Sequence, residues 1–271
     1  MAITQRDYPA DLVEAARRVL LELTRLLAEY RDDVVVIGGW VPELLLANHI
    51  GSIDVDLALN HIHLKEIGYK SIERLLLDNG YFKDQRQPFI FHKIISVNGL
   101  EIDVEVDFLA GEYPAERPKS RTQKVQDVNT RKARGCDLAF DMYDEVKIAG
   151  ILPGGEKATA TIRVASIVSF LIMKGMALGR GKEKDSYDIY FCLTRYHGGL
   201  DKLIADFRPY ICLVLVREGL EKIADEFASV DHIGPNHVAN FNEIYDEPER
   251  AALKRDVYER VDYLLKQLGV I

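Results

Sequence analysis

Two segments of the chain alternate acidic and apolar side chains, which is the pattern of β-strands that carry carboxylates on one face. The first covers residues 53–59, IDVDLAL, and places Asp54 and Asp56 on one face because strand side chains alternate with period two. The second covers residues 100–109, LEIDVEVDFL, whose acids on a shared face are Asp103, Glu105 and Asp107. Strand interiors normally exclude Asp and Glu, so this pattern restricts both the fold and the chemistry of the chain.

Like charges on neighbouring strands repel each other unless a cation lies between them. Mg²⁺ prefers oxygen ligands and usually combines a few carboxylates with the phosphates of a substrate. Two carboxylate-bearing strands therefore indicate a magnesium platform for phosphoryl or nucleotidyl transfer. A solvated face of an antiparallel sheet gives the same alternation, so each strand taken alone is equally compatible with that plainer structure.

The segment just before the first acidic strand helps to decide between these alternatives. Residues 34–37, VVVI, form a β-branched run of the buried-strand type, Gly38 and Gly39 end it, and Pro42 suits the first turn of a helix. Such a turn is a ready anion site, because backbone N–H groups face the ligand and glycine lets the backbone approach it. An isolated Gly-Gly pair more often marks only a tight turn. Followed 15 residues later by Asp-x-Asp on a strand, it favours a nucleotide site.

The whole chain predicts an α+β protein in two parts: a mixed α/β domain over residues 1–160 and a helical domain over 161–271. In the first part, Asn98-Gly99 is the turn signal of a hairpin. Helices are predicted there over 11–30, 42–48 and 64–79, and strands over 34–37, 53–59, 88–96, 100–109, 144–151 and 158–164. In the second part, helices are predicted over 165–178, 185–196, 199–217, 219–228 and 247–268.

Composition excludes several classes of protein. The 271 residues carry 35 Lys and Arg against 43 Asp and Glu, a formal net charge of −8, which excludes nucleic-acid binding by bulk positive charge. No apolar run reaches the length of a membrane helix, and the N-terminus lacks the apolar core of an export signal. Three widely spaced cysteines form neither a disulfide framework nor a zinc-binding pattern. We therefore expect a cytoplasmic protein that does not contact a membrane.

A second group of charged residues occurs in the helical part. Lys174 lies on the apolar stripe of the helix predicted over 165–178, where it must either extend to solvent or meet an anion. Residues 179–188, GRGKEKDSYD, follow it, and their basic side chains suit either a phosphate or a solvated loop. Asp185 and Asp188 have the spacing of a helix capping box, which is the simplest interpretation of this pair alone.

Residues 34–59, VVVIGGWVPELLLANHIGSIDVDLAL, resemble the nucleotidyltransferase superfamily related to DNA polymerase beta. The resemblance implies a nucleotidyltransferase-fold mixed sheet with flanking helices, followed by a helical C-terminal domain. It also implies that nucleotide phosphates contact Gly38 and Gly39, and that Ser52 belongs to the nucleotide site. Asp54 and Asp56 would bind Mg²⁺, with two ions expected.

The family's third carboxylate stands on a later strand. Asp107 matches it best because it precedes Phe108-Leu109 at a strand end, and Glu105 and Asp103 are the alternatives. Ile50 stands where many relatives have an Arg, four residues before the first metal-binding Asp. This departure leaves the positioning of the nucleotide or of its loop open, but it does not affect the metal site.

Residues 174–190, KGMALGRGKEKDSYDIY, resemble the C-terminal motifs of AbiEii-type nucleotidyltransferases. These include toxins of type IV toxin–antitoxin systems and related mycobacterial toxins that modify transfer RNA. In that family one helix supplies a Lys, an Arg follows it, and an Asp-x-x-Asp motif begins the next helix. The corresponding residues of this chain are Lys174, Arg180, Asp185 and Asp188. The resemblance implies catalytic roles for Lys174 and Asp188 and nucleotide-binding roles for Lys174, Arg180 and Asp185.

The combined prediction is a Mg²⁺-dependent nucleotidyltransferase that transfers NMP from an NTP to an acceptor hydroxyl. The expected acceptor is an RNA such as the 3′ end of a transfer RNA, and the resemblance adds an antitoxin protein as a partner. The RNA backbone would be held by residues 180–184 and by the basic side chains of 117–134: Arg117, Lys119, Arg121, Lys124, Arg131, Lys132 and Arg134.

Two alternatives stay open. A small-molecule acceptor, as in antibiotic-modifying nucleotidyltransferases, suits the acidic net charge but not the basic stretch at 117–134. A non-catalytic module of the same fold, which only binds a nucleotide or a partner protein, is disfavoured by the intact Asp-x-Asp.

Overall fold

The computed structural model describes residues 4–60, 71–111, 122–125 and 128–271, and of residues 122–125 it describes the backbone alone. Its contacts divide the chain into two compact units. The sheet unit comprises Pro9–Leu44 and Gly51–Ser166, and the helical unit comprises Leu45–Ile50, Ile167–Ile271 and the residues up to Tyr8. The sequence places a boundary between residues 160 and 161, whereas the contacts divide at Ser166 and also assign an upstream segment to the helical unit.

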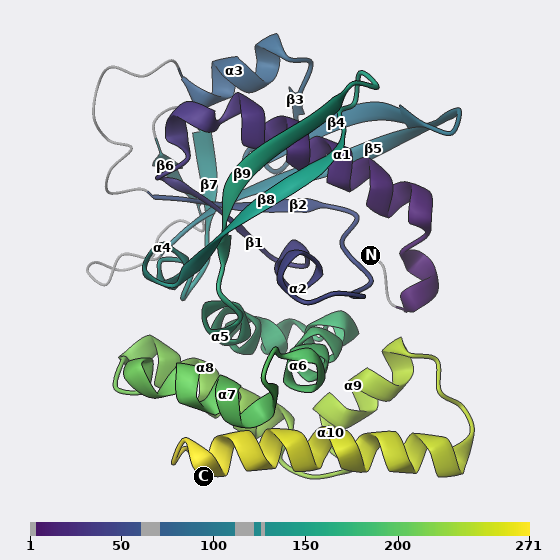
Figure 1. Ribbon diagram of the computed structural model, residues 1–271, viewed down its shortest axis with the longest axis vertical. Coiled ribbons are helices and arrows are strands. Elements are labelled where there is room, and N and C mark those ends of the chain that lie inside the picture. Colours follow the sequence, from purple (N-terminus) through teal and green to yellow (C-terminus); the bar gives the residue numbers. More distant parts are fainter. Residues whose placement is uncertain (1–3, 61–70, 112–121, 126–127) are drawn as a thin grey trace. The chain divides into compact units, whose positions relative to one another are not determined.

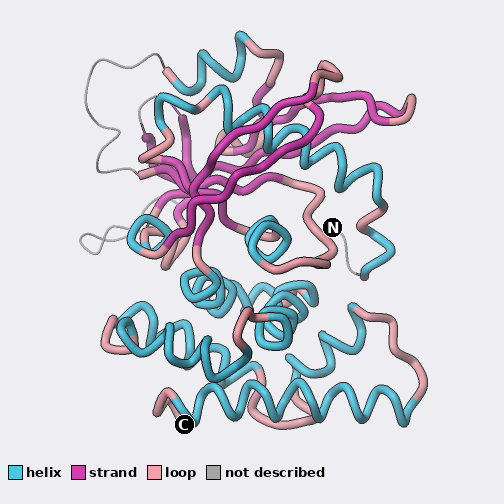
Figure 2. The backbone as a smooth tube through the Cα atoms, in the orientation of Figure 1, coloured by secondary structure: helices cyan, strands magenta, loops and turns pink. Residues whose placement is uncertain are grey.

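The sheet unit is built on a mixed sheet with parallel and antiparallel strand pairs (Figures 1 and 2). Its described strands are β1 (Val34–Ile37), β2 (Val55–Leu59), β3 (Phe82–Lys83), β4 (Ile90–Val97), β5 (Leu100–Ala110), β6 (Thr122–Val125), β7 (Val128–Lys132), β8 (Tyr143–Ile151) and β9 (Lys157–Ala165). Their order is β3-β4-β5-β2-β1-β9-β8, and β7 pairs with both β5 and β6. The helices that begin in this unit are α1 (Ala10–Leu26), α2 (Trp40–Leu45), α3 (Ile72–Asp78) and α4 (Leu138–Asp141). The predicted α+β class with a mixed sheet is confirmed.

The centre of this sheet is buried because its strands carry apolar side chains on both faces. All four residues of β1 are buried, and β1 pairs antiparallel with β2 and parallel with β9. Helix α1 contacts β4, β5, β8 and β9 (Figure 1). Its own residues Ala16, Val19 and Leu23 are completely buried by this packing. The helix predicted over 11–30 ends at Leu26, and a 3₁₀ turn over Ala28–Tyr30 follows it.

Most elements predicted for the sheet unit are present. Asn98 and Gly99 turn the β4–β5 hairpin with φ angles of 51° and 81°, the positive values that a type I′ turn needs. The strands predicted over 144–151 and 158–164 are β8 and β9. β3, β6, β7 and α4 are not predicted; β7 has the polar sequence VNTRK and becomes a strand through its pairing with β5 and β6. The first residues of the helix predicted over 64–79 lie outside the described residues.

The helical unit consists of helices packed on one another (Figure 2). They are α5 (Ile167–Ala177), α6 (Glu183–Arg195), α7 (Gly199–Phe207), α8 (Val214–Glu226), α9 (Ile233–Phe241) and α10 (Glu247–Gln267). α5 and α8 approach closely, since a Cβ built on Gly175 would lie 2.3 Å from the carbonyl oxygen of Gly219. None of the helices in the described ranges is long and apolar enough to cross a membrane.

For the helical unit, one predicted helix is wrong and one helix is missed. The helix predicted over 199–217 is broken, because Pro209 lacks the N–H that a continuous helix needs, and α8 begins only at Val214. Helix α9 is not predicted, because Gly234 and Pro235 in its first turn resemble loop residues.

Candidate functional site

The two acidic strands lie side by side in the sheet unit. β2 and β5 run parallel, and their register places Asp56 opposite Asp107. Paired residues of neighbouring strands project to the same face, so these two carboxylates are neighbours. β2 begins at Val55, and Asp54 lies in the bend that leads into it. We call Asp54, Asp56 and Asp107 the acidic cluster.

Of the three alternating acids on β5, Asp107 is the one that is buried. It is 9% exposed, whereas Asp103 and Glu105 are exposed side chains. The Asp103 carboxylate is 3.1 Å from Nδ1 of His92 on β4. Register and burial therefore favour Asp107 over the two alternatives as the third carboxylate.

The Asp107 carboxylate is held at one oxygen and open at the other. Nη2 of Arg131, on β7, lies 2.6 Å from Asp107 Oδ2. Asp107 Oδ1 is buried and has no hydrogen-bond partner among the described residues. Burial and the neighbouring Asp56 charge raise the pKa of Asp107 to about 8, against the opposing effect of Arg131. This carboxylate is therefore incompletely neutralised by the groups around it.

Asp54 is fixed through both its side chain and its backbone. Ser52 Oγ donates a hydrogen bond to Asp54 Oδ1 at 2.5 Å, and Trp40 Nε1 donates to the Asp54 carbonyl oxygen at 2.8 Å. Trp40 is fully buried. No local pattern in the sequence marks this tryptophan as a partner of Asp54. Ser52, which the resemblance places in the nucleotide site, orients a carboxylate of the acidic cluster.

The glycine turn after β1 touches the acidic cluster. Gly38 has a φ of +69°, and a Cβ built on it would lie 2.0 Å from Asp56 Oδ2. Only glycine leaves room for the Asp56 carboxylate at this turn. Gly39 beside it is buried. Helix α2 has only six residues, so phosphate binding at this turn would depend on close approach to the backbone more than on a helix dipole.

The donor set of the acidic cluster suits a hard divalent cation. Asp107 Oδ1 is buried without a partner in the described part of the chain, and the Asp56 carboxylate lies beside it. Across the described residues, no group of three or more His, Cys, Asp or Glu side chains is arranged to hold a metal ion by itself. Mg²⁺ is commonly held by one or two carboxylates together with substrate phosphates, and the neighbouring Asp56 and Asp107 fit that mode.

A second group of charged side chains is buried in the helical unit. Lys174 Nζ is 2.7 Å from the Asp188 carboxylate, Lys184 Nζ is 3.0 Å from it, and His49 Nε2 is 3.0 Å from it. Lys174 also contacts Asp185 at 2.6 Å. Burial alone would raise the pKa of Asp188, but the charges of Lys174 and Lys184 hold it below its usual range. We call these five residues the Asp188 network.

This network corrects one interpretation of the sequence. Helix α6 begins at Glu183 with Lys182 as its N-cap, and no side chain caps it. Asp185 and Asp188 are therefore not a capping box, because both carboxylates contact Lys174 of α5. Lys174 meets anions rather than solvent, with 13% of its side chain exposed. These anions belong to the same chain, so a nucleotide contact of Lys174 or Asp185 stays a prediction.

Arg180 lies at the edge of this network, whereas His49 is one of its buried members. Nearly half of the Arg180 side chain is exposed; its guanidinium lies 3.5 Å from Asp185 and donates to the Ala177 carbonyl. His49 is fully enclosed and lies 139 residues from Asp188 in sequence, so no local pattern could link them. An ionised Asp188 can only accept, so His49 donates through Nε2–H. Burial lowers the pKa of His49 to about 4, although the hydrogen bond with Asp188 acts in the opposite direction.

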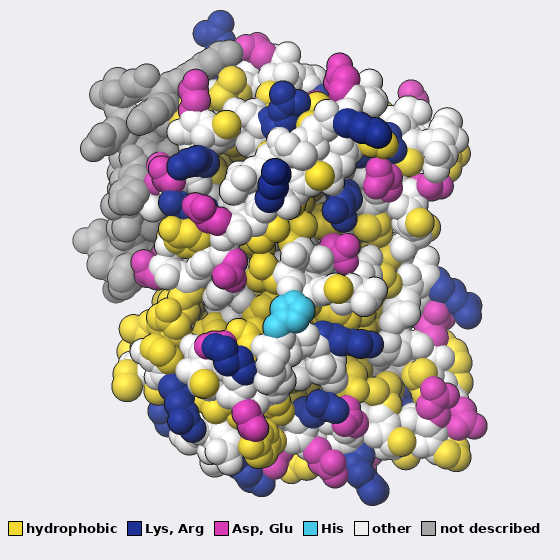
Figure 3. Space-filling view, in the orientation of Figure 1, with side chains coloured by type: hydrophobic (Ala, Val, Ile, Leu, Met, Phe, Trp, Pro, Cys, Tyr) yellow, Lys and Arg dark blue, Asp and Glu magenta, His cyan; other side chains and the backbone are white. Residues whose placement is uncertain are grey.

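The basic stretch predicted to hold RNA is described only in part. Residues 117–121 and the side chain of Lys124 lie outside the described residues. Of the remainder, Arg131 contacts the acidic cluster, Lys132 is half-buried and Arg134 is exposed. On the described part of the face in Figure 3, basic and acidic side chains are interspersed without a broad region of one charge. An RNA-binding surface therefore stays a prediction.

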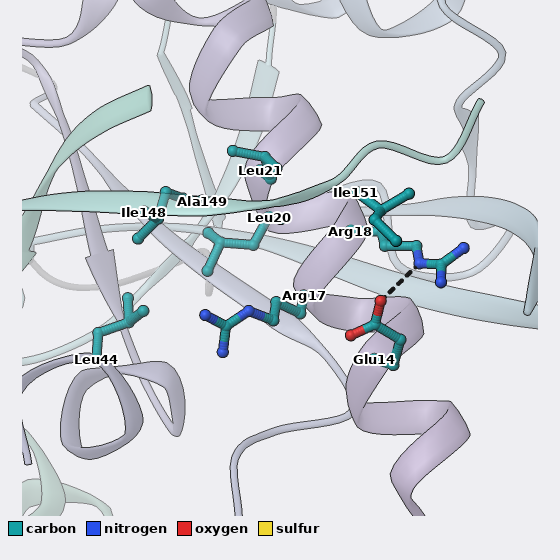
Figure 4. A pocket seen from close by; sticks show the side chains of 10 residues that line it. Glu14, Arg17, Arg18, Leu20, Leu21, Leu44, Ile148, Ala149 and Ile151 are labelled. Atoms are coloured by element: carbon teal, nitrogen blue, oxygen red, sulfur yellow. Dashed lines mark hydrogen bonds and ion pairs between the residues drawn. The ribbon is translucent and has the colours of Figure 1, made fainter. Parts of the chain in front are cut away.

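A separate pocket of about 220 Å³ lies between α1, α2 and β8 (Figure 4). Its charged side chains are already paired: Arg18 with Glu14 at 2.8 Å, and Arg17 with Glu43 at 3.7 Å. The apolar residues that line it are Leu20, Leu21, Leu44, Ile148, Ala149 and Ile151. No residue of the acidic cluster lines this pocket.

Comparison with known proteins adds no family assignment. No protein-family model matches the chain, and no curated protein matches it. The resemblance carried by residues 34–59 and 174–190 therefore stays a prediction made from motifs.

Replacing His49 by glutamine should flatten the pH dependence of stability. Unfolded His49 takes up its proton near pH 6.5, whereas folded His49 does so near pH 4. The free energy of unfolding should therefore fall as the pH falls from about 6.5 to about 4, by about 3 kcal/mol, since one pKa unit corresponds to about 1.4 kcal/mol. Urea unfolding of the unmodified chain and of H49Q across this range measures the effect. Equal pH dependence in both proteins would contradict it.

Replacing Gly38 by alanine should destabilise the sheet unit by about 1–3 kcal/mol more than a matched glycine substitution, because overpacking costs about that much. The matched control is Gly99→Ala, which also has a positive φ but meets no atom within 4 Å of the added Cβ. Both variants carry the backbone strain, and only Gly38→Ala adds the clash with Asp56. Urea unfolding of the two variants gives the difference, and equal losses would show that the Asp56 carboxylate does not occupy this turn.

Proposed function

We propose that the chain is a Mg²⁺-dependent nucleotidyltransferase whose metal-binding carboxylates lie in its sheet unit, and that this unit has the nucleotidyltransferase fold. The observation that carries this proposal is the pairing of Asp56 with Asp107 across two parallel strands. Two further features support it: Asp54 is fixed just before β2, and a glycine turn touches Asp56. The motif resemblance of residues 34–59 points to the same chemistry.

The residues of the acidic cluster and the residues around it have distinct proposed roles. Divalent cations, when bound, would neutralise the triphosphate and stabilise the in-line displacement of pyrophosphate. Asp56 and Asp107 would hold them together with Asp54, which the family resemblance adds as a ligand, and Ser52 would keep the Asp54 carboxylate in place. Gly38 would leave the turn open to phosphate, and Asp107 would accept the proton of the attacking hydroxyl.

We further propose an RNA acceptor, in line with the AbiEii-type resemblance of residues 174–190, and an antitoxin as the protein partner of such an enzyme. Lys174, Arg180, Asp185 and Asp188 are proposed to serve the nucleotide and the reaction. Arg180 has the clearest support for a ligand contact, because its guanidinium is nearly half exposed and lies 3.5 Å from its nearest carboxylate.

A labelling experiment tests the reaction class. The chain is incubated with Mg²⁺, total RNA and each NTP in turn, labelled at the α-phosphate, and RNA should become labelled. NTP labelled at the γ-phosphate should leave the RNA unlabelled, because pyrophosphate departs. Label from the γ-phosphate would indicate phosphoryl transfer instead. Mg²⁺-dependent NTP binding without any labelled RNA would favour a small-molecule acceptor, and the absence of such binding would favour a non-catalytic module.

Removing one charge from the acidic cluster should abolish transfer without unfolding the chain. We expect D54N, D56N and D107N each to lose at least about 100-fold in rate, which corresponds to about 2.7 kcal/mol of transition-state stabilisation. D103N and E105Q are matched controls, because they remove exposed acids from the face of β5 that carries Asp107. If E105Q is inactive and D107N is active, the third carboxylate is Glu105.

Replacing Arg180 by glutamine should weaken NTP binding about 10- to 150-fold, because a charge-assisted hydrogen bond contributes about 1.5–3 kcal/mol. Lys182→Gln is the matched control, since it removes a neighbouring positive charge that contacts no carboxylate of the network in the described structure. Equilibrium binding of a labelled NTP measures the effect, and melting temperatures check folding. Equal affinities of both variants would place Arg180 outside the nucleotide site.

A further inference from the structure

Arg131 reaches the acidic cluster because of the strand register. β7 pairs parallel with β5, and Arg131 lies opposite Leu109. Leu109 and Asp107 are two residues apart and therefore project from the same face of β5. Paired residues share a face as well, so the Arg131 side chain starts on the face that carries Asp107 and Asp56.

The contact that follows is specific to one carboxylate oxygen. Arg131 Nη2 is 2.6 Å from Asp107 Oδ2, and Asp107 Oδ1 remains buried without a partner in the described chain. The guanidinium also lies over the ring of Phe89, with Cζ 5.8 Å from its centroid. A buried acceptor without a partner costs about 1–3 kcal/mol, so a fold retains one where a ligand is to be bound.

Resting on the proposed function, we propose that Arg131 is a positioning residue for the divalent cation: it holds Asp107 by Oδ2 and so presents Oδ1 to the metal. Carboxylates that ligate metals are commonly fixed by such an outer hydrogen bond, and removing it typically lowers metal affinity about 10–100-fold. Arg131 also offsets part of the repulsion between Asp107 and Asp56. This role differs from the RNA contact that the basic sequence around it predicts.

Mn²⁺ binding to the full chain, without RNA or nucleotide, tests the proposal through the electron paramagnetic resonance of free Mn²⁺. We expect R131Q to bind Mn²⁺ about 10–100-fold more weakly, and R131K, which keeps the charge and one donor, to recover part of the loss. Circular dichroism and melting temperature confirm that the variants are folded.

R163Q is the matched control. Arg163 Nη2 lies 2.6 Å from Asp32, and its guanidinium lies over the ring of Tyr143, so the substitution removes an ion pair of equal length and a similar ring contact. R163Q removes one positive charge, as R131Q does, but Asp32 is not part of the acidic cluster. R163Q should leave Mn²⁺ affinity unchanged.

The outcomes separate this inference from the proposed function. Unchanged Mn²⁺ affinity in R131Q would overturn the positioning role, and tighter binding would show that Arg131 competes with the metal. In either case, weaker binding by D56N and D107N would leave the proposed function standing. Equal Mn²⁺ affinity in D56N, D107N and the unmodified chain, or no binding by the unmodified chain with or without NTP, would overturn the proposed function itself.

Discussion

The repulsion between Asp56 and Asp107 is the constraint around which the sheet unit is organised. Parallel pairing of β2 and β5 places two carboxylates on one face, where burial and proximity make full ionisation unfavourable. A sheet designed only for stability would place apolar or oppositely charged residues at this pair. The glycine turn and Arg131 each accommodate this arrangement locally. An unfavourable feature supported by several neighbours is typical of a functional site.

The two units treat buried acids in opposite ways. Asp188 receives three donors and is ionised within a closed set of partners. Asp107 receives one donor on one oxygen and keeps the other unpartnered within the described residues. A closed network of this kind holds elements together, and breaking it by removing one partner is costly. An incomplete coordination shell has capacity for a ligand, which is why the proposed metal site is assigned to the sheet unit.

Periodic patterns predicted much of the fold, and their failures have physical causes. The VVVI strand and the Asn98-Gly99 hairpin agree with the structure because local sequence determines them. β7 and α9 are missed because tertiary contacts override weak local preference, through strand pairing in the first case and helix packing in the second. The alternation on β5 limited the candidates for the third carboxylate to three acids, with Asp107 preferred for its place at the strand end. The register with β2 and the burial of Asp107 favour the same residue. The contacts of His49 with Asp188 and of Arg131 with Asp107 could not be predicted from sequence patterns, because each joins segments that are distant in sequence.

The assignment of Leu45–Ile50 to the helical unit has a consequence for how the chain acquires its structure. During synthesis, His49 leaves the ribosome 139 residues before the carboxylate that it contacts. No contiguous fragment ending at Ser166 contains that carboxylate, and no fragment starting at Ile167 contains His49. The contact of His49 thus forms only after Asp188 has been made, and the segment Leu45–Ile50 makes the sheet unit discontinuous in sequence. A chain cut at Ser166 would place the residues of the helical unit on two fragments, so we expect the full-length chain, rather than two co-expressed halves, to form this unit.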